Sequence, residues 1–104
     1  MRITWPTAIV LAALEAGHPW GFQIIDVTGL RAGTVYPILR RLEADGMVRS
    51  SWEKVARARA EARPPRRNYR LTASGWEAVA AAHARYPTLG RLFSATGEEG
   101  AQPA

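Results

Sequence analysis

One helix pattern constrains the fold of this 104-residue chain more than any other feature. In the stretch "AGTVYPILRRLEAD", residues 32–45, the apolar side chains follow the spacing i, i+3, i+4, i+7; they are Val35, Ile38, Leu39 and Leu42. That spacing predicts a helix with one buried stripe, and Gly46 is suited to end it. The opposite side of this helix is therefore predicted to point outward.

That outward side is slim at its beginning and basic further along. Its members are Gly33, Pro37, Arg40 and Ala44, and they are flanked by Thr34, Tyr36 and Arg41. A DNA major groove about 12 Å wide admits a helix, and small residues at the leading end let the backbone come close. Tyr36 can hydrogen-bond or press its ring on a sugar or a thymine methyl, and Arg40 and Arg41 can reach a phosphate or a guanine. We interpret this side as a DNA-contacting surface. The alternative is a solvated face on which the two arginines pair with Glu43 and Asp45.

Pro37 stands inside this helix pattern. An interior proline removes one backbone hydrogen bond and costs on the order of 3 kcal/mol, although less where the first turn is already irregular. Gly33 permits such irregularity, so we predict a bend near the entry of the helix, on its exposed side. The alternative is that residues 33–36 form a loop and the helix begins at Pro37.

The rest of the chain predicts five further elements and possible extra turns. A first helix runs from about Pro6 to Ala16, with Thr4 as its cap and Gly17 after its end, and it is apolar enough to need several covering neighbours. A short helix follows over about Trp20–Thr28, ended by Gly29. Strand candidates cover residues 47–55 and 66–71, and a last helix begins after the cap residue Thr72 and continues to about Tyr86, with a further turn in "TLGRLFSA".

Residues 56–65, "ARARAEARPP", lie between the two strand candidates. Because the diproline blocks helix propagation, we predict a long hairpin loop, with a short Ala/Arg helix over residues 56–62 as the alternative. Two helices joined by a tight turn and followed by a hairpin predict a mainly α fold with a small β-hairpin. The expected organisation is a winged helix-turn-helix over residues 1–71, a C-terminal helix over 72–96 and a flexible tail over 97–104.

Positive charge is concentrated in the middle of the chain. Residues 31–70 hold eleven basic and four acidic side chains, a net +7, whereas the remainder carries −2. This distribution favours one face for an anionic polymer, and arginine binds phosphates and guanine edges well. The basic residues of the predicted wing are Lys54, Arg57, Arg59, Arg63, Arg66 and Arg67. We expect them to contact the DNA backbone and minor groove, and a disordered loop that adds only non-specific affinity is the alternative.

Other classes of protein are disfavoured. The chain has no cysteine, and its two histidines, His18 and His83, are far apart, so a metal site or disulfide is not expected. It lacks a nucleophile–base–acid set and a phosphate-binding glycine loop, so we predict no enzyme activity and no cofactor. No apolar run is long enough to span a bilayer, and Glu15 interrupts the only stretch resembling a secretion signal. We expect a cytoplasmic protein.

Three motifs in order resemble the PadR family of bacterial transcriptional regulators. They are "GTVYPILRRLEADGMV", "SWE" and "RPPRRNYRLTASG", and with the entry motif at Trp20-Gly21-Phe22 they cover about residues 21–76. The resemblance implies a winged helix-turn-helix homodimer that binds a palindromic operator in double-stranded DNA, usually as a repressor. It also implies dimerisation through the C-terminal helix, often with the first helix, and in some members release from DNA by an aromatic small molecule.

The chain departs from the family pattern at several positions. Arg31 stands where the family often has a capping Ser or Asn, and we expect it to hold a phosphate. Ala62 replaces a usual glycine before "RPP", and Pro87 interrupts a short C-terminal region.

The dimerisation candidates are Trp5, Ile9, Trp76, Val79, Ala80, His83, Tyr86 and Leu89. Candidates for an aromatic effector site are Trp5, Trp52, Trp76 and Tyr86, with ordinary packing as the alternative. For the whole chain, the alternative to an operator-binding regulator is a protein- or RNA-binding winged helix without operator specificity.

Overall fold

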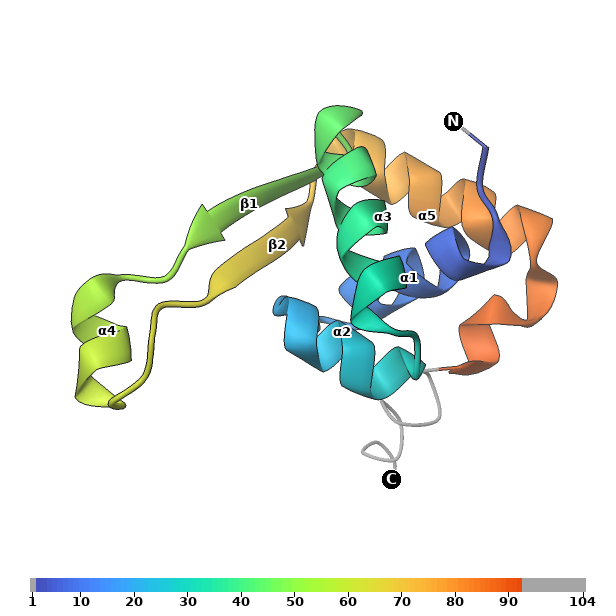
Figure 1. The fold of residues 1–104 in the computed structure, drawn as a ribbon. Coiled ribbons are helices and arrows are strands. Elements are labelled where there is room, and N and C mark those ends of the chain that lie inside the picture. The colour runs from blue at the N-terminus through green and yellow to red at the C-terminus, as the bar shows by residue number, and fades with distance from the viewer. Residues whose placement is uncertain (1, 93–104) are drawn as a thin grey trace, which may run out of the picture.

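The computed structural model describes residues 2–92 and folds them into a cluster of helices from which a β-hairpin projects (Figure 1). The elements in chain order are α1 (Trp5–Glu15), α2 (Gly21–Thr28), α3 (Ala32–Ala44), β1 (Val48–Trp52), α4 (Val55–Ala60), β2 (Arg67–Leu71), α5 (Ala73–Arg85) and the 3-10 helix η1 (Pro87–Gly90). This order confirms the mainly helical winged fold. The predicted tail, residues 97–104, and the predicted helix end, residues 93–96, lie outside the described residues. None of the helices in the described part could cross a membrane, because each is too short or too polar.

α1 lies at the centre of the helical cluster. Thr4 caps it as predicted, and its hydroxyl oxygen accepts a hydrogen bond from the Thr7 amide at 3.4 Å. Gly17 follows the end of the helix with a φ of +95°, a left-handed conformation that suits glycine. Every residue from Thr7 to Leu14 is buried, which confirms that several neighbours cover this helix. Those neighbours are α2, α3, α5, β2 and η1.

α2 and α3 form the helix-turn-helix. α2 ends at Gly29, whose φ of +73° turns the chain toward α3. The predicted stripe of α3 is confirmed, since all four of its members are buried: Val35, Ile38, Leu39 and Leu42.

α3 continues through Pro37 from Ala32 to Ala44. The proline is therefore inside the helix, and the alternative in which the helix begins there is wrong. Because proline has no N–H, the carbonyl of Gly33 cannot receive its usual i+4 hydrogen bond. Gly33 is exposed, so water can satisfy that carbonyl and reduce the cost of the proline.

The hairpin is antiparallel, with Val48 opposite Leu71 at its base and Trp52 opposite Arg67 at its outer end. Its base is part of the core, because Val48 and Tyr69 are 2% and 8% exposed. The Tyr69 amide also donates to the Pro19 carbonyl at 2.8 Å, and Trp20, just before α2, forms an isolated β-bridge with Asn68 of β2. The stem of the wing is thus attached to the body on both sides.

The tip of the wing corrects one prediction. Residues 55–60 form a helix, α4, and not the predicted loop. The alternative prediction, a short Ala/Arg helix in this segment, is therefore the one confirmed. Alanine and arginine have high helix propensity, and Pro64 and Pro65 stand beyond the end of the helix, where they do not interrupt it. Ala62 has a φ of +54°, so it adopts the glycine-like conformation expected where the related pattern has glycine.

α5 begins as predicted after Thr72, whose hydroxyl accepts a hydrogen bond from the Gly75 amide at 3.1 Å. By helical spacing the sequence puts Trp76, Val79, Ala80, His83 and Tyr86 on one side of this helix, but that side is not the buried one. The buried residues are Gly75, Ala78, Val79 and Ala82, whereas Trp76 and Ala80 are exposed and His83 and Tyr86 are half-buried. Because alanines lie all around this helix, its apolar pattern marks no single face. The small residues face the interior, and they let α5 lie close to its neighbours.

Candidate nucleic-acid interface

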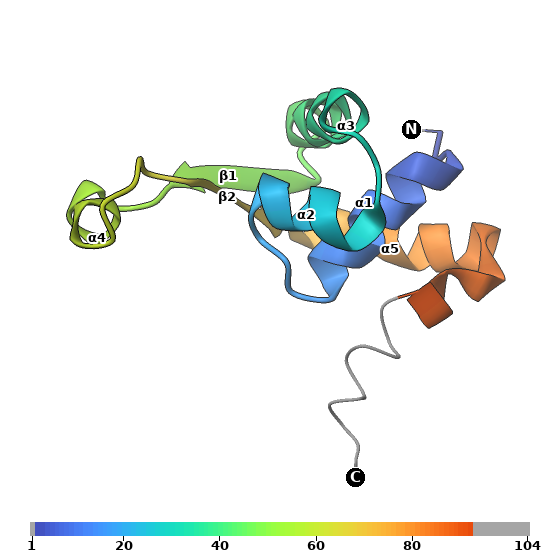
Figure 2. The same ribbon diagram turned by 60° about the horizontal axis from the view of Figure 1, so that its bottom comes forward.

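α3 presents its predicted outward side to solvent. Gly33, Arg40 and Ala44 are exposed, and Pro37 is partly exposed. Figure 2 shows why, because α3 lies on one side of the cluster, with α1, α2 and α5 below it and the wing beside it. The flanking residues Thr34 and Arg41 are half-buried and exposed, respectively.

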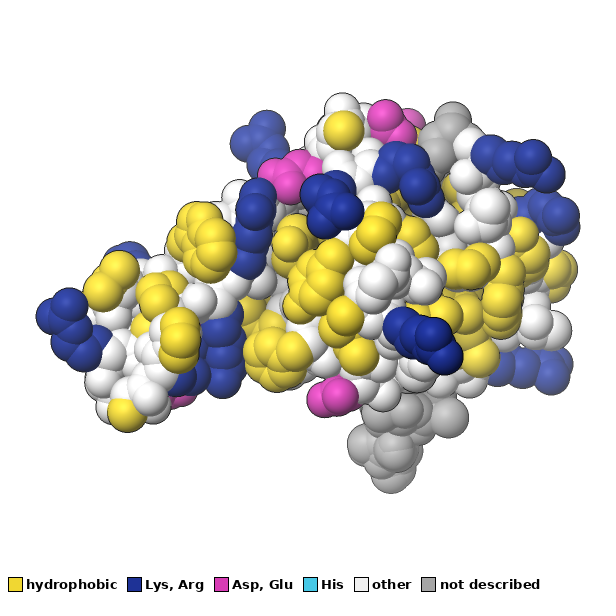
Figure 3. Space-filling view, in the orientation of Figure 1, with side chains coloured by type: hydrophobic (Ala, Val, Ile, Leu, Met, Phe, Trp, Pro, Cys, Tyr) yellow, Lys and Arg dark blue, Asp and Glu magenta, His cyan; other side chains and the backbone are white. Residues whose placement is uncertain are grey.

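The face that carries α3 and the wing is rich in basic side chains (Figure 3). They are spread from the wing tip across to the helices, with hydrophobic side chains between them and few acidic ones. Seven of the predicted DNA-binding cations are exposed: Arg31, Arg40, Arg41, Lys54, Arg57, Arg59 and Arg67. The surface therefore combines charge with a protruding helix, as recognition of a DNA duplex requires.

Tyr36 lies differently from the prediction. Its side chain is half-buried and packs over Gly21, the first residue of α2, rather than standing free beside the outward side of α3. A β-carbon at position 21 would lie 2.7 Å from the Tyr36 hydroxyl oxygen, so any other residue at this position would require the ring to shift. Sequence reasoning missed this contact, which joins the two helices of the helix-turn-helix.

Arg31 occupies the N-cap of α3 and makes no side-chain capping bond there, as expected of a poor cap residue. The residue is exposed and lies beside the first turn of α3. A cationic residue therefore directly precedes the end of the helix that carries partial positive charge.

A network of three polar side chains connects the wing to α3. The Ser50 hydroxyl donates to Glu43 Oε2 at 2.6 Å, and Arg67 donates to Ser50 Oγ through Nε and Nη2 at 3.0 and 2.9 Å. Arg67 Nη2 also lies 3.4 Å from Glu43 Oε1. Glu43 thus pairs with Arg67 instead of with Arg40 or Arg41. Because Arg67 is 24 residues away from Glu43 in the sequence, no local pattern predicted this pair.

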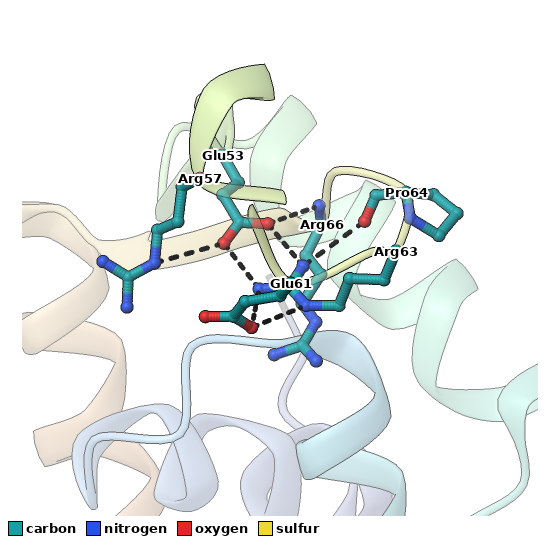
Figure 4. A network of polar contacts seen from close by, with 6 residues as sticks. All are labelled: Glu53, Arg57, Glu61, Arg63, Pro64 and Arg66. Carbon is teal, nitrogen blue, oxygen red and sulfur yellow. Dashed lines mark hydrogen bonds and ion pairs between the residues drawn. The ribbon is translucent and has the colours of Figure 1, made fainter. Parts of the chain in front are cut away.

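A second network organises the wing tip around Glu53, whose side chain is 5% exposed (Figure 4). Arg63 donates to both carboxylate oxygens, Nη1 to Oε1 at 2.6 Å and Nη2 to Oε2 at 2.8 Å. The Arg66 amide donates to Oε1 at 3.2 Å, and Arg57 Nε lies 3.6 Å from Oε2. Hydrogen bonding from Arg63 lowers the pKa of Glu53 to about 2, and the same bond raises the pKa of Arg63.

Arg66 connects the wing with α2. Its guanidinium carbon lies 4.8 Å from the centre of the Phe22 ring and 5.6 Å from that of Trp20. These distances are within the range of cation–π attraction. The sequence predicted Arg66 as a DNA contact, and the structure places it at the outer end of the hairpin, over the rings of Trp20 and Phe22.

The pKa of Glu53 predicts how the wing tip responds to acid. Because the folded pKa is depressed, the Glu53–Arg63 pair contributes its full stability above the ordinary pKa of 4.5 and loses it as the pH falls toward about 2. We expect the NMR signals of the Arg63 guanidinium to remain those of an ordered group down to about pH 4.5. Averaging of those signals already at pH 6 would contradict the geometry of this pair.

The predicted dimerisation residues divide into three groups. Ile9, Val79 and Leu89 are 8%, 4% and 1% exposed, so they belong to the core of the chain and present no surface to a second copy. Trp5, Trp76 and Ala80 are exposed. The remaining two candidates make contacts within the chain. The Tyr86 ring meets the Trp5 ring edge-on at 5.2 Å, and His83 Nε2 lies 2.8 Å from Glu15 Oε1.

Comparison with known sequences gives one family. The family model described as "Transcriptional regulator PadR-like family" matches residues 10–81. That range contains α2, α3 and the whole wing. No curated protein matches the chain.

Several solved structures share the fold. A PadR family transcription regulator from Clostridium difficile R20291 has a TM-score of 0.69 at 18% identity, over 88% of this chain and 96% of that chain. A PadR family regulator from Eggerthella lenta DSM 2243 has a TM-score of 0.59 at 23% identity, over 93% and 84% of the two chains. The PcaV regulator from Streptomyces coelicolor, solved with its natural ligand, has a TM-score of 0.66 at 22% identity, over 89% of this chain and 62% of that one.

Proposed function

This chain belongs to the PadR-like family of transcriptional regulators, and we propose that it is a repressor that binds a palindromic operator in double-stranded DNA as a homodimer. Membership of the family makes it a regulator and not an enzyme. The observation that carries the proposal is the exposed outward side of α3, which joins a slim first turn to two exposed arginines.

α3 enters the major groove with its N-terminal end. Gly33 and Thr34 let the backbone approach the bases, and Arg31 binds a phosphate beside the first turn. Arg40 and Arg41 lie further along the same helix, where each reaches a guanine edge or a phosphate. Tyr36 supports this geometry from the α2 side, because its ring packs over Gly21.

The wing contacts the DNA beside α3. Lys54, Arg57 and Arg59 are exposed at its tip, and they bind phosphates or the rim of the minor groove. Arg63, Arg66 and Arg67 make contacts within the chain, so their main contribution is to the shape of the wing.

A homodimer places two α3 helices in successive major grooves, about 34 Å apart. The exposed apolar residues of α1 and of the C-terminal region offer the surface for that contact: Trp5 is 39% exposed, Trp76 is 51% exposed and Leu92 is 42% exposed. A short chain gains stability by covering such residues with a second copy.

An aromatic small molecule that releases the DNA completes the proposal. A hollow of about 450 Å³ lies beside Trp5 and Tyr86, and Arg2 and Arg85 line it as well. Aromatic rings and guanidinium groups together suit a flat, anionic ligand. Since the operator is on the bacterial chromosome, the proposed place of action is the cytoplasm.

Selection of bound duplexes from a random DNA pool tests the proposed function. A homodimer on a palindromic operator is expected to yield a consensus with two-fold symmetry, and half-sites about one helical turn apart. Binding without a consensus would instead indicate an architectural protein, and preferential binding of RNA would overturn the proposal.

Gly33→Ala separates folding from DNA binding. A β-carbon at position 33 has nothing within 4 Å, so we expect the variant to be as stable as the parent or up to about 1 kcal/mol more stable. The added methyl stands on the side proposed to meet the DNA, so operator affinity is expected to fall about tenfold, or about 1.4 kcal/mol. Thermal melting and a binding titration measure the two effects. Unchanged affinity would show that the first turn of α3 does not approach DNA.

A further inference from the structure

The most basic part of the chain encloses an acidic side chain. Glu53 lies between the exposed cations of the wing, and its side chain is 5% exposed. On the basis of the proposed DNA-binding function, we propose that Glu53 is a positioning residue, which folds the wing tip so that Lys54, Arg57 and Arg59 can reach DNA phosphates. Its removal therefore weakens DNA binding, although it removes a charge of the same sign as that of DNA.

The contacts of Glu53 close the wing tip into a loop. Glu53 precedes α4 and Arg63 follows it, and the bidentate pair between them joins the two ends of the segment (Figure 4). The Glu53 amide also donates to the Arg66 carbonyl at 2.8 Å, which continues the strand pairing beyond Trp52 and Arg67. The residue therefore fixes the segment through its side chain and its backbone.

α4 depends on this closure. It has only six residues, and a helix of that length is not stable in isolation. Its single buried residue, Ala58, is 1% exposed and lies beside the segment that Glu53 and Arg63 hold. Without the pair, α4 loses the frame that keeps it folded, and its arginines lose their fixed positions.

The charges of the wing tip divide into two groups. The Arg63 side chain is 18% exposed, and both of its terminal nitrogens contact the carboxylates of Glu53 or Glu61. Arg63 is therefore not available to bind a DNA phosphate. Lys54 and Arg59 are exposed and form no salt bridge within residues 2–92, and the Arg57 side chain is 71% exposed. The second group is the set that can release counterions when it meets phosphates.

Glu53→Gln tests the proposal. The variant keeps the size of the side chain and raises the net charge by one, so simple electrostatics predicts tighter binding. We expect the opposite: operator affinity falls about tenfold, and the slope of log affinity against log salt decreases by about 2. A role in the stability of the body alone would not change the salt slope.

Three variants serve as controls. Glu61→Gln makes the same chemical change at a residue that is 49% exposed, and it is expected to leave operator affinity unchanged or slightly increased. Arg59→Gln removes one exposed cation and is expected to decrease the salt slope by about 1. Arg63→Gln should reproduce the effect of Glu53→Gln, and the double variant should be no weaker than either single variant. If Glu53→Gln binds DNA like Glu61→Gln, the proposal is overturned.

Hydrogen exchange of the free chain separates this proposal from the proposed function. The amide of Arg66 donates to Glu53 Oε1, so it is expected to exchange faster in Glu53→Gln, while the melting temperature of the body changes little. Equal exchange rates in parent and variant would overturn the positioning role. Absence of operator binding by the parent chain would overturn the proposed function instead, and the exchange experiment would still decide whether Glu53 orders the wing.

Discussion

Gly75→Ala is expected to destabilise the folded chain by about 2 kcal/mol or more. A β-carbon at position 75 would overlap the carbonyl oxygen of Met47 and would lie 3.0 Å from Leu71 Cδ2. The Met47 carbonyl cannot move away freely, since it accepts the Thr72 amide at 3.0 Å. The Thr72 hydroxyl in turn donates to the Gly46 carbonyl at 2.7 Å, so the first turn of α5 is held against the turn between α3 and β1.

The loss of stability in Gly75→Ala is the difference between a steric cost and a gain in helix propensity. Alanine is favoured over glycine by about 1 kcal/mol inside a helix, whereas forcing an atom into a packed site costs up to about 3 kcal/mol or more. The net loss is large for a domain whose total stability is about 5–15 kcal/mol. Urea unfolding followed by circular dichroism measures it. Gly33→Ala is the matched control, because it lies in the first turn of α3 and its added methyl meets nothing. A midpoint for Gly75→Ala equal to that of the parent would contradict the packing described for α5.

Arg40→Ala is expected to cause the largest loss of operator binding among single changes of exposed residues. Arg40 lies on the outward side of α3, where a bidentate contact with guanine contributes about 1–3 kcal/mol of discrimination. We therefore expect affinity for the selected operator to fall by about 5- to 150-fold, with less change in non-specific binding. Because the side chain is exposed, the melting temperature should stay near that of the parent.

Arg91→Ala provides the comparison for this prediction. It removes the same charge from an exposed residue after η1, outside the helix-turn-helix and the wing. Binding titrations at one salt concentration compare the two variants directly. Equal losses for Arg40→Ala and Arg91→Ala would mean that net charge alone governs binding, and that α3 does not read the operator.

Local signals were sufficient to predict most of the fold. Thr4 and Thr72 cap their helices, and Gly29 and Gly46 adopt positive φ values where helices end. The apolar spacing in α3 identified its buried stripe, and hence its outward side. These features depend on residues close together in sequence, so a single chain contains enough information to predict them.

The remaining features depend on residues far apart in the chain. Glu43 finds Arg67 rather than a nearby arginine, because the hairpin brings β2 alongside β1 and so to α3. Tyr36 turns toward Gly21 because α2 leaves a space there. The many alanines of α5 gave no preferred face. At the wing tip, the diproline suggested a loop. The sequence did not reveal that Glu53 and Arg63, on either side of a short helix, would pair with each other and hold that helix in position.

The wing tip has a further consequence for how such proteins diversify. Its hydrogen bonds and ion pairs around Glu53 lie within residues 53–66, and among the contacts described above only the Arg66 guanidinium reaches out of this segment, to Trp20 and Phe22. The segment therefore largely determines its own shape. If these residues were transferred to the hairpin of another regulator, the Glu53–Arg63 pair that orders them would be transferred with them. The wing tip can therefore change in length or sequence during evolution while the helices proposed to read the operator stay unchanged.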